Sequence, residues 1–103
     1  EYPIETVVKV DDTVGGIEEG LNAGCWTIGV SDWSNYMNID TMEQWNQMSE
    51  SEKQERKMNS MNKLLKESNA NIVISDIRFL PEAINTINQC LRFGYGPNDI
   101  FFK

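Results

Sequence analysis

The sequence predicts an α/β domain built on a small parallel sheet. Three short apolar runs, at residues 6–10, 25–30 and 71–75, have the length and the β-branched content of buried strands. Amphipathic helical segments follow the first and third runs, and a long excursion with a helix follows the second. Alternation of this kind is typical of βαβ units, in which helices cover the faces of a parallel sheet. We therefore expect about three parallel strands with flanking helices.

A short helix is predicted between the first two strands. Asp12 or Thr13 is a suitable N-cap, and Gly24 is placed to end the helix before the strand at residues 25–30. One apolar face recurs at helical spacing: Val14, Ile17 and Leu21.

The segment between the second and third strands falls into two parts. Residues 31–48 have no clear period but contain many large apolar side chains, so we expect a partly packed excursion. Ser49 followed by Glu52 has the spacing of a capping box, and it opens a helix that extends to about Ser68. The predicted apolar stripe of this helix consists of Met58, Met61, Leu64 and Leu65.

An amphipathic helix follows the third strand. Pro81 lies in its first turn and Gly94 marks its end. Its apolar positions are Leu80, Ala83, Ile84, Ile87 and Leu91. Residues 95–103 have no readable period, so we expect a tail there.

Composition excludes several classes of protein. The chain has 103 residues, enough for one domain, and a net charge of -7 without a basic cluster, which argues against nucleic acid or a membrane surface as a partner. No apolar run approaches the ~20 residues of a membrane span. Cys25 and Cys90 lie far apart in a chain without histidine, so we expect buried free thiols of a reducing, cytoplasmic compartment rather than zinc ligands. The spacing leaves a disulfide between them open.

Two adjacent acids, Asp11 and Asp12, follow the first strand. Ligands of open parallel sheets bind at the carboxyl ends of the strands. Adjacent carboxylates can bind a hard cation such as Mg²⁺, which would offset their repulsion. The alternative is that Asp12 caps the helix and Asp11 is simply solvated. Spacing alone leaves both interpretations open.

Paired acids after a first strand also resemble the receiver domains of response regulators, in which Asp76 would match the phospho-acceptor. The chain between the two stretches contains an extra strand, an excursion and a full helix, too much for that fold. Only one helix and a tail follow Asp76, so the later hydroxyl and lysine of that family have no strands to occupy. We reject this resemblance.

A closer resemblance rests on the run VVKVDDTVGGIEEGLNAGCWTIGV. It resembles the fourth-motif region of the haloacid dehalogenase (HAD) superfamily and, within it, the phosphonoacetaldehyde hydrolases or phosphonatases. The family's Lys-Val-(Gly/Asp)-Asp-Thr is matched by Lys9–Thr13, and its Glu-Gly-x-Asn-Ala-Gly-x-Trp-Thr-(Val/Ile)-Gly is matched from Glu19 to Gly29. The resemblance covers roughly residues 2–93, including the excursion, the charged helix and the last strand and helix.

The resemblance implies that residues 1–103 are the C-terminal portion of a Rossmann-like HAD core, with the cap domain and the N-terminal strand absent. It implies a Mg²⁺-dependent hydrolase that cleaves the carbon–phosphorus bond of phosphonoacetaldehyde to acetaldehyde and phosphate. In that family an aspartate of the first core strand attacks phosphorus, and a cap lysine forms a Schiff base with the aldehyde. The metal-binding acid is matched by Asp12, with Asp11 as a secondary ligand.

Two features depart from the family pattern. Gly16 stands where some members have a second acid, and residues 31–40 lack the usual Gly- and Leu-rich pattern, which questions a role for Ser34 or Asn35 near the substrate. The nucleophile strand, the hydroxyl motif, the basic third motif and the cap lysine have no match, because Lys9 aligns with a strand residue. We therefore expect the parent protein to be an enzyme and this chain alone to be inactive.

The same reasoning predicts a binding partner. The strand at residues 7–10 would pair with the nucleophile strand in the complete core, so we expect its edge to pair with the missing N-terminal half or with a second copy of the chain. The complete enzyme would bind a phosphonate or phosphate small molecule. The alternatives are a degenerate, non-catalytic HAD-like interaction module or another HAD phosphatase. Asp76 is expected to cap or orient a loop, and Trp26 to lie in the core.

Overall fold

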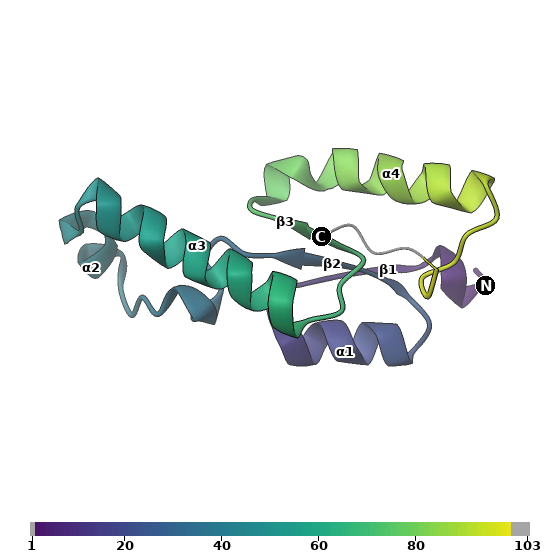
Figure 1. Ribbon diagram of the computed structural model, residues 1–103, viewed down its shortest axis with the longest axis horizontal. Helices are drawn as coiled ribbons and strands as arrows, with labels where there is room; N and C mark the ends of the chain where they lie inside the picture. Colours follow the sequence, from purple (N-terminus) through teal and green to yellow (C-terminus); the bar gives the residue numbers. More distant parts are fainter. Residues whose placement is uncertain (1, 100–103) are drawn as a thin grey trace.

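The computed structural model describes residues 2–99 and has three layers (Figure 1). Three parallel strands in the order β1-β2-β3 form the central sheet, with α4 on one face and α1 and the end of α3 on the other. The predicted fold class is therefore confirmed. The elements are η1 (Ile4–Thr6), β1 (Val8–Asp11), α1 (Val14–Asn22), β2 (Trp26–Val30), η2 (Asn35–Met37), α2 (Met42–Gln47), α3 (Glu50–Glu67), β3 (Ile72–Ile74), η3 (Ile77–Phe79) and α4 (Leu80–Arg92).

The first strand is displaced from the predicted residues 6–10. Thr6 belongs to the 3₁₀ turn η1, because its backbone N–H and its hydroxyl both donate to the carbonyl of Pro3, at 2.9 and 2.7 Å. β1 begins at Val8 and continues to Asp11. The first acid of the pair is thus the last residue of a strand, so the sheet itself places it.

The second and third strands are shorter than predicted. Cys25 lies outside β2, because its N–H donates to the carbonyl of Gly20 at the end of α1, at 2.9 Å. β3 covers residues 72–74 of the predicted 71–75. Both strands occupy the predicted places, and the errors affect single residues at their ends.

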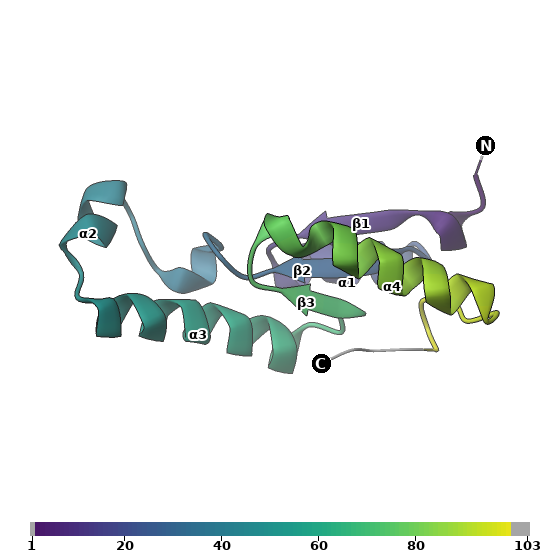
Figure 2. The same ribbon diagram turned by 90° about the horizontal axis from the view of Figure 1, so that it is seen from above.

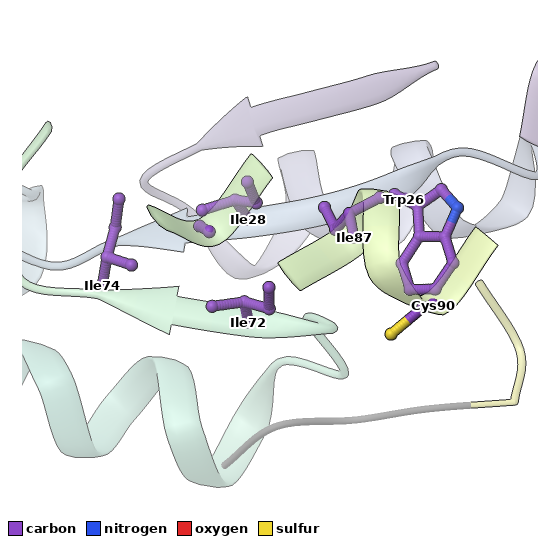
Figure 3. Close-up of a cluster of buried hydrophobic side chains, with 7 residues drawn as sticks. Trp26, Ile28, Ile72, Ile74, Ile87 and Cys90 are labelled. Atoms are coloured by element: carbon purple, nitrogen blue, oxygen red, sulfur yellow. The ribbon is translucent and has the colours of Figure 1, made fainter. Parts of the chain in front are cut away.

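The strand side chains alternate between two buried layers. Trp26 and Ile28 of β2, together with Ile72 and Ile74 of β3, face α4 and form the main core with Ile87 and Cys90 (Figure 3). The predicted core position of Trp26 is confirmed, since its side chain is fully buried. On the opposite face Leu64 of α3 packs over Gly29 of β2.

Two helices begin where the sequence signals place them. The hydroxyl of Ser49 accepts a hydrogen bond from the N–H of Glu52 at the start of α3, and Pro81 lies in the first turn of α4. Gly24 follows α1 with φ of +91°, a conformation that favours glycine. Local sequence signals therefore determine the starts of α3 and α4 and the end of α1.

The apolar stripe predicted for α3 is wrong at one position. Met58 is 61% exposed, whereas Leu64 is fully buried and Met61 and Leu65 are half-buried. The reason is that the first half of α3 extends past the edge of the sheet (Figure 2), so no strand lies beneath its early turns. Ser60 is buried instead, and its hydroxyl donates to the carbonyl of Ser31 at 2.6 Å.

The excursion after β2 packs along the projecting half of α3. It contains the short helices η2 and α2, which the sequence did not indicate, and the buried side chain of Met37. Arg56 of α3 donates to the carbonyls of Met37 and Asn38, at 3.2 and 2.6 Å. Two residues of this segment, Trp33 and Asn38, have positive φ of 66° and 56°, conformations that favour glycine.

The chain after α4 turns back onto the core over its described part, residues 95–99. The N–H of Tyr95 donates to the carbonyl of Cys90, and the amide of Asn71 donates to the carbonyl of the buried Pro97, at 2.6 Å. Residues 100–103 of the expected tail lie outside the described residues. Cys25 and Cys90 are both buried free thiols, as expected, and form no disulfide. Within residues 2–99 no helix is both long and apolar enough to cross a membrane.

Candidate functional site

The acid pair lies in the turn between β1 and α1, at the carboxyl edge of the sheet. Asp11 ends the strand, Asp12 follows it, and Thr13 is the N-cap of α1 because its hydroxyl accepts a hydrogen bond from the N–H of Gly16, at 3.0 Å. Asp12 is therefore not the cap, which removes one of the two roles that spacing left open for it.

Asp11 is fully engaged within the turn. Its Oδ1 accepts hydrogen bonds from the N–H and the hydroxyl of Thr13, at 2.9 and 2.8 Å, and Lys9 Nζ lies 4.0 Å from Oδ2. Partial burial raises the pKa of Asp11, but the hydrogen bonds from Thr13 and the charge of Lys9 outweigh it, so the pKa lies below its ordinary value. The carboxylate is thus held in its charged form by the turn.

The carboxyl group of Asp11 occupies the space above Gly16. A Cβ built on Gly16 would overlap that carboxyl group, whereas a Cβ on the neighbouring Gly15 would meet nothing within 4 Å. A side chain at position 16, including the second acid of some family members, is sterically incompatible with this placement of Asp11. The departure at Gly16 and the presence of Asp11 are therefore two parts of one local arrangement.

Asp12 differs from its neighbour in every respect. Its side chain is exposed, and among residues 2–99 its carboxylate has no hydrogen bond or ion pair. Its backbone carbonyl accepts a hydrogen bond from the hydroxyl of Ser34, at 2.7 Å. Of the two adjacent acids, Asp12 is the one whose oxygens are available to a cation.

Two residues of the excursion reach this turn, and the sequence did not predict it. Besides the Ser34 contact, the hydroxyl of Tyr36 accepts a hydrogen bond from the N–H of Val14, the first residue of α1, at 2.8 Å. Lys63 of α3 lies over the Tyr36 ring, with Nζ 5.5 Å from its centroid. No local sequence signal could have found these contacts, because 22 residues separate the partners in the chain.

The pair fits a Mg²⁺ site only in part. Mg²⁺ in enzymes is commonly held by one or two carboxylates, with waters and substrate phosphate oxygens completing six oxygen ligands. The exposed carboxylate of Asp12 matches that role. In the described part of the chain, this turn included, no group of three or more His, Cys, Asp or Glu residues could hold a metal ion.

Asp76 also lies at the carboxyl end of the sheet, but it follows β3, the edge strand opposite β1. It caps η3, as expected, with its carboxylate accepting from the N–H of Arg78 at 2.9 Å, and this hydrogen bond is the main reason why the pKa of Asp76 is lowered. A groove of about 420 Å³ opens beside it. Its lining includes Asp32 and Lys57, paired at 3.8 Å, and the exposed Met58. The strand order separates this groove from the acid pair, since β1 and β3 are opposite edges.

Several proteins similar to this chain are phosphonoacetaldehyde hydrolases. No protein-family model matches it. Phosphonoacetaldehyde hydrolase of Hahella chejuensis is 33% identical over 95 residues, and that of Syntrophobacter fumaroxidans is 38% identical over 96 residues. The Salmonella agona protein of the same name is 38% identical over 90 residues. These alignments cover 87–93% of the chain but only 32–34% of the relatives, so the chain spans about a third of their length.

Solved structures agree with this similarity. A phosphonoacetaldehyde hydrolase-like protein from Oleispira antarctica superposes with a TM-score of 0.78 and 36% identity, over 92% of this chain and 34% of that one. A second structure, 24% identical and also at a TM-score of 0.78, supports the fold alone.

Together, the fold and the comparisons show a chain that resembles part of the α/β core of phosphonatase-like HAD proteins. Over most of its length it is homologous to phosphonoacetaldehyde hydrolases, as the motif around Asp12 predicted.

Proposed function

We propose that this chain supplies the metal-binding corner of a Mg²⁺-dependent enzyme that hydrolyses the carbon–phosphorus bond of phosphonoacetaldehyde, giving acetaldehyde and phosphate. Two observations carry the proposal: relatives of that name align with nearly the whole chain, and Asp12, at the carboxyl end of β1, presents a carboxylate that has no partner among the described residues. A phosphonate or phosphate small molecule is the corresponding ligand of the complete enzyme.

The two acids have different roles in this proposal. Asp12 binds the cation directly, and Asp11 acts through Thr13, whose N–H and hydroxyl it holds, to keep the turn in shape. When bound, Mg²⁺ offsets the negative charge of the phosphoryl oxygens and so permits the approach of an anionic nucleophile. Asp11 also adds negative charge beside the ion while it keeps its own hydrogen bonds.

The remaining chemistry is assigned to residues outside this chain. The resemblance implies a nucleophilic aspartate and a Schiff-base lysine, and neither has a match in the sequence. We therefore expect the 103-residue chain alone to release no acetaldehyde from phosphonoacetaldehyde. Further oxygen ligands of the metal belong, in this proposal, to the same missing part.

The edge of β1 is the surface on which that missing part would bind. β1 is an edge strand, and Val10 on it and Val7 before it are 38% and 37% exposed. An edge strand offers unpaired backbone groups to another strand. We propose that β1 pairs with a strand of the missing half and, without it, with a second copy of the chain. The two buried free thiols favour a reducing, cytoplasmic location.

A chimeric enzyme tests the proposal. The chain is grafted in place of the matching third of the Salmonella agona phosphonoacetaldehyde hydrolase, and acetaldehyde release is measured with and without Mg²⁺. We expect Mg²⁺-dependent turnover that Asp12→Asn abolishes and that Glu18→Gln, at an exposed position of α1, leaves unchanged. A folded chimera without turnover, or turnover that survives Asp12→Asn, would contradict the proposal.

A further inference from the structure

The turn that carries Asp12 is held from outside by two hydrogen bonds. On one side of Thr13, the hydroxyl of Ser34 donates to the backbone carbonyl of Asp12, at 2.7 Å. On the other side, the N–H of Val14 donates to the hydroxyl of Tyr36, at 2.8 Å. The two bonds hold the peptide units that flank the turn, and both come from the segment that follows the neighbouring strand β2.

Each bond satisfies a group that the turn itself leaves open. The first amides of a helix have no acceptor within the helix, and Thr13 satisfies only that of Gly16. The Tyr36 hydroxyl satisfies the Val14 amide. Ser34 is only 4% exposed, so its bond to Asp12 is shielded from competing water.

The donor, Ser34, and the acceptor, Tyr36, are themselves held in place. Ser34 caps η2, and Met37 of the same short helix is buried to 1% exposure. Arg56 of α3 holds the carbonyl of Met37, and the ammonium of Lys63 lies over the Tyr36 ring. Because these side chains are held by α3, the position of the turn depends on the position of α3.

We infer that Ser34 and Tyr36 are positioning residues for the Asp12 carboxylate. Because that carboxylate has no partner among the described residues, its direction is set by the backbone of residues 12–14, and the two hydrogen bonds fix that backbone. A cation at Asp12 would therefore bind more weakly once either bond is removed. The inference rests on the proposed metal-binding role of Asp12.

Mn²⁺ alone, added to the 103-residue chain, provides the test. Its paramagnetic broadening of the amide NMR signals of residues 11–14 reports weak binding at that turn. Ser34→Ala and Tyr36→Phe each delete one hydroxyl, and the matched controls are Ser51→Ala on the exposed side of α3 and Tyr95→Phe, at a tyrosine that is 46% exposed. Dispersed spectra establish that each variant is folded.

We expect both test variants to weaken Mn²⁺ binding by about 3–10-fold, at or below the lower end of the effect of removing an orienting partner of a metal ligand. The two controls should leave it unchanged. Tyr36→Phe should also accelerate hydrogen exchange of the Val14 amide. A general loss of stability would accelerate the exchange of many amides and not of this one in particular.

The outcomes separate this inference from the proposed function. Broadening that Asp12→Asn abolishes, but that Ser34→Ala and Tyr36→Phe leave unchanged, would overturn the positioning role and keep Asp12 as a ligand. Broadening that Asp12→Asn does not reduce would overturn the metal-binding role and the inference together. Weakening in the two test variants, with loss in Asp12→Asn, supports both.

Discussion

Two adjacent glycines at the start of α1 give the sharpest test of the structure. Gly15 and Gly16 both lie in the first turn of the helix, yet a methyl group would meet nothing at Gly15 and would overlap the Asp11 carboxyl group at Gly16. Gly15→Ala and Gly16→Ala are therefore the same chemical change in neighbouring positions. We expect them to have opposite effects on the free energy of unfolding.

The magnitude follows from the contacts. Replacing glycine by alanine within a helix stabilises it by about 0.5–1 kcal/mol, which is the whole effect expected for Gly15→Ala. At Gly16 the new methyl group displaces the Asp11 carboxylate from the N–H and the hydroxyl of Thr13. Hydrogen bonds to a charged group are worth about 1.5–3 kcal/mol, and this pair is partly exposed, so we take about 2–3 kcal/mol for both together. The two variants should differ by about that amount.

Urea denaturation followed by tryptophan fluorescence measures both variants. A double-mutant cycle with Asp11→Ala then isolates the cause. In the Asp11→Ala background no carboxylate remains above the helix, so Gly16→Ala should become as favourable as Gly15→Ala. Equal stabilities of the two single variants would refute the reasoning, and so would a penalty at Gly16 that persists without the Asp11 carboxylate.

Three further predictions concern other parts of the fold. Thr13→Val removes the N-cap and a hydroxyl donor to Asp11, so it should lower the free energy of unfolding by about 1–2 kcal/mol and raise the pKa of Asp11 measured by carboxyl NMR. Because the pKa of Asp11 is lower in the folded than in the unfolded state, its stabilisation of the fold is present above about pH 4 and is lost as the pH falls through the folded-state pKa. Asn71→Ala leaves a buried amide of β2 without its acceptor and should cost about 1–3 kcal/mol in urea denaturation, whereas Asn88→Ala on the exposed side of α4 should change stability by less than about 0.5 kcal/mol. Val10→Lys, which places a charge on the edge strand, should reduce concentration-dependent association in sedimentation velocity; unchanged association would show that β1 is not the contact.

The sequence predicted best what short-range signals determine. Ser49 and Pro81 mark helix starts by direct contact with the next few backbone amides or by a restricted φ, so the starts of α3 and α4 were predicted within a residue. The start of β1 depends on the local 3₁₀ turn that Thr6 forms with Pro3, which strand propensity does not indicate, and its end depends on pairing with β2, which is a tertiary contact. Met58 was misassigned for a similar reason, since helical periodicity does not show where the sheet beneath a helix ends.

The candidate site was predictable in place but not in detail. The motif located Asp11 and Asp12 at the end of the first strand, yet it gave both the same role. Their difference arises because the Asp11 carboxyl group turns toward Thr13 over the space that Gly16 leaves open, which only the three-dimensional turn reveals. The contacts of Ser34 and Tyr36 were missed because they join segments that are distant in the chain.

The projecting half of α3 affects which part of the molecule unfolds first by local unfolding. The molecule measures 47 × 24 × 23 Å, and one end consists of α2, η2 and the first turns of α3, beyond the sheet (Figure 2). Among the described apolar side chains of this end, Met37 is the fully buried one; the end is otherwise held by polar contacts such as those of Arg56, and by Trp33 and Trp45 packed edge to face at 4.9 Å between ring centroids. Segments with few buried apolar contacts open at lower free energy than a core. Amide protection should therefore fall stepwise along α3, from the turn of Leu64 toward its N-terminus, so that one continuous helix belongs to two cooperative units.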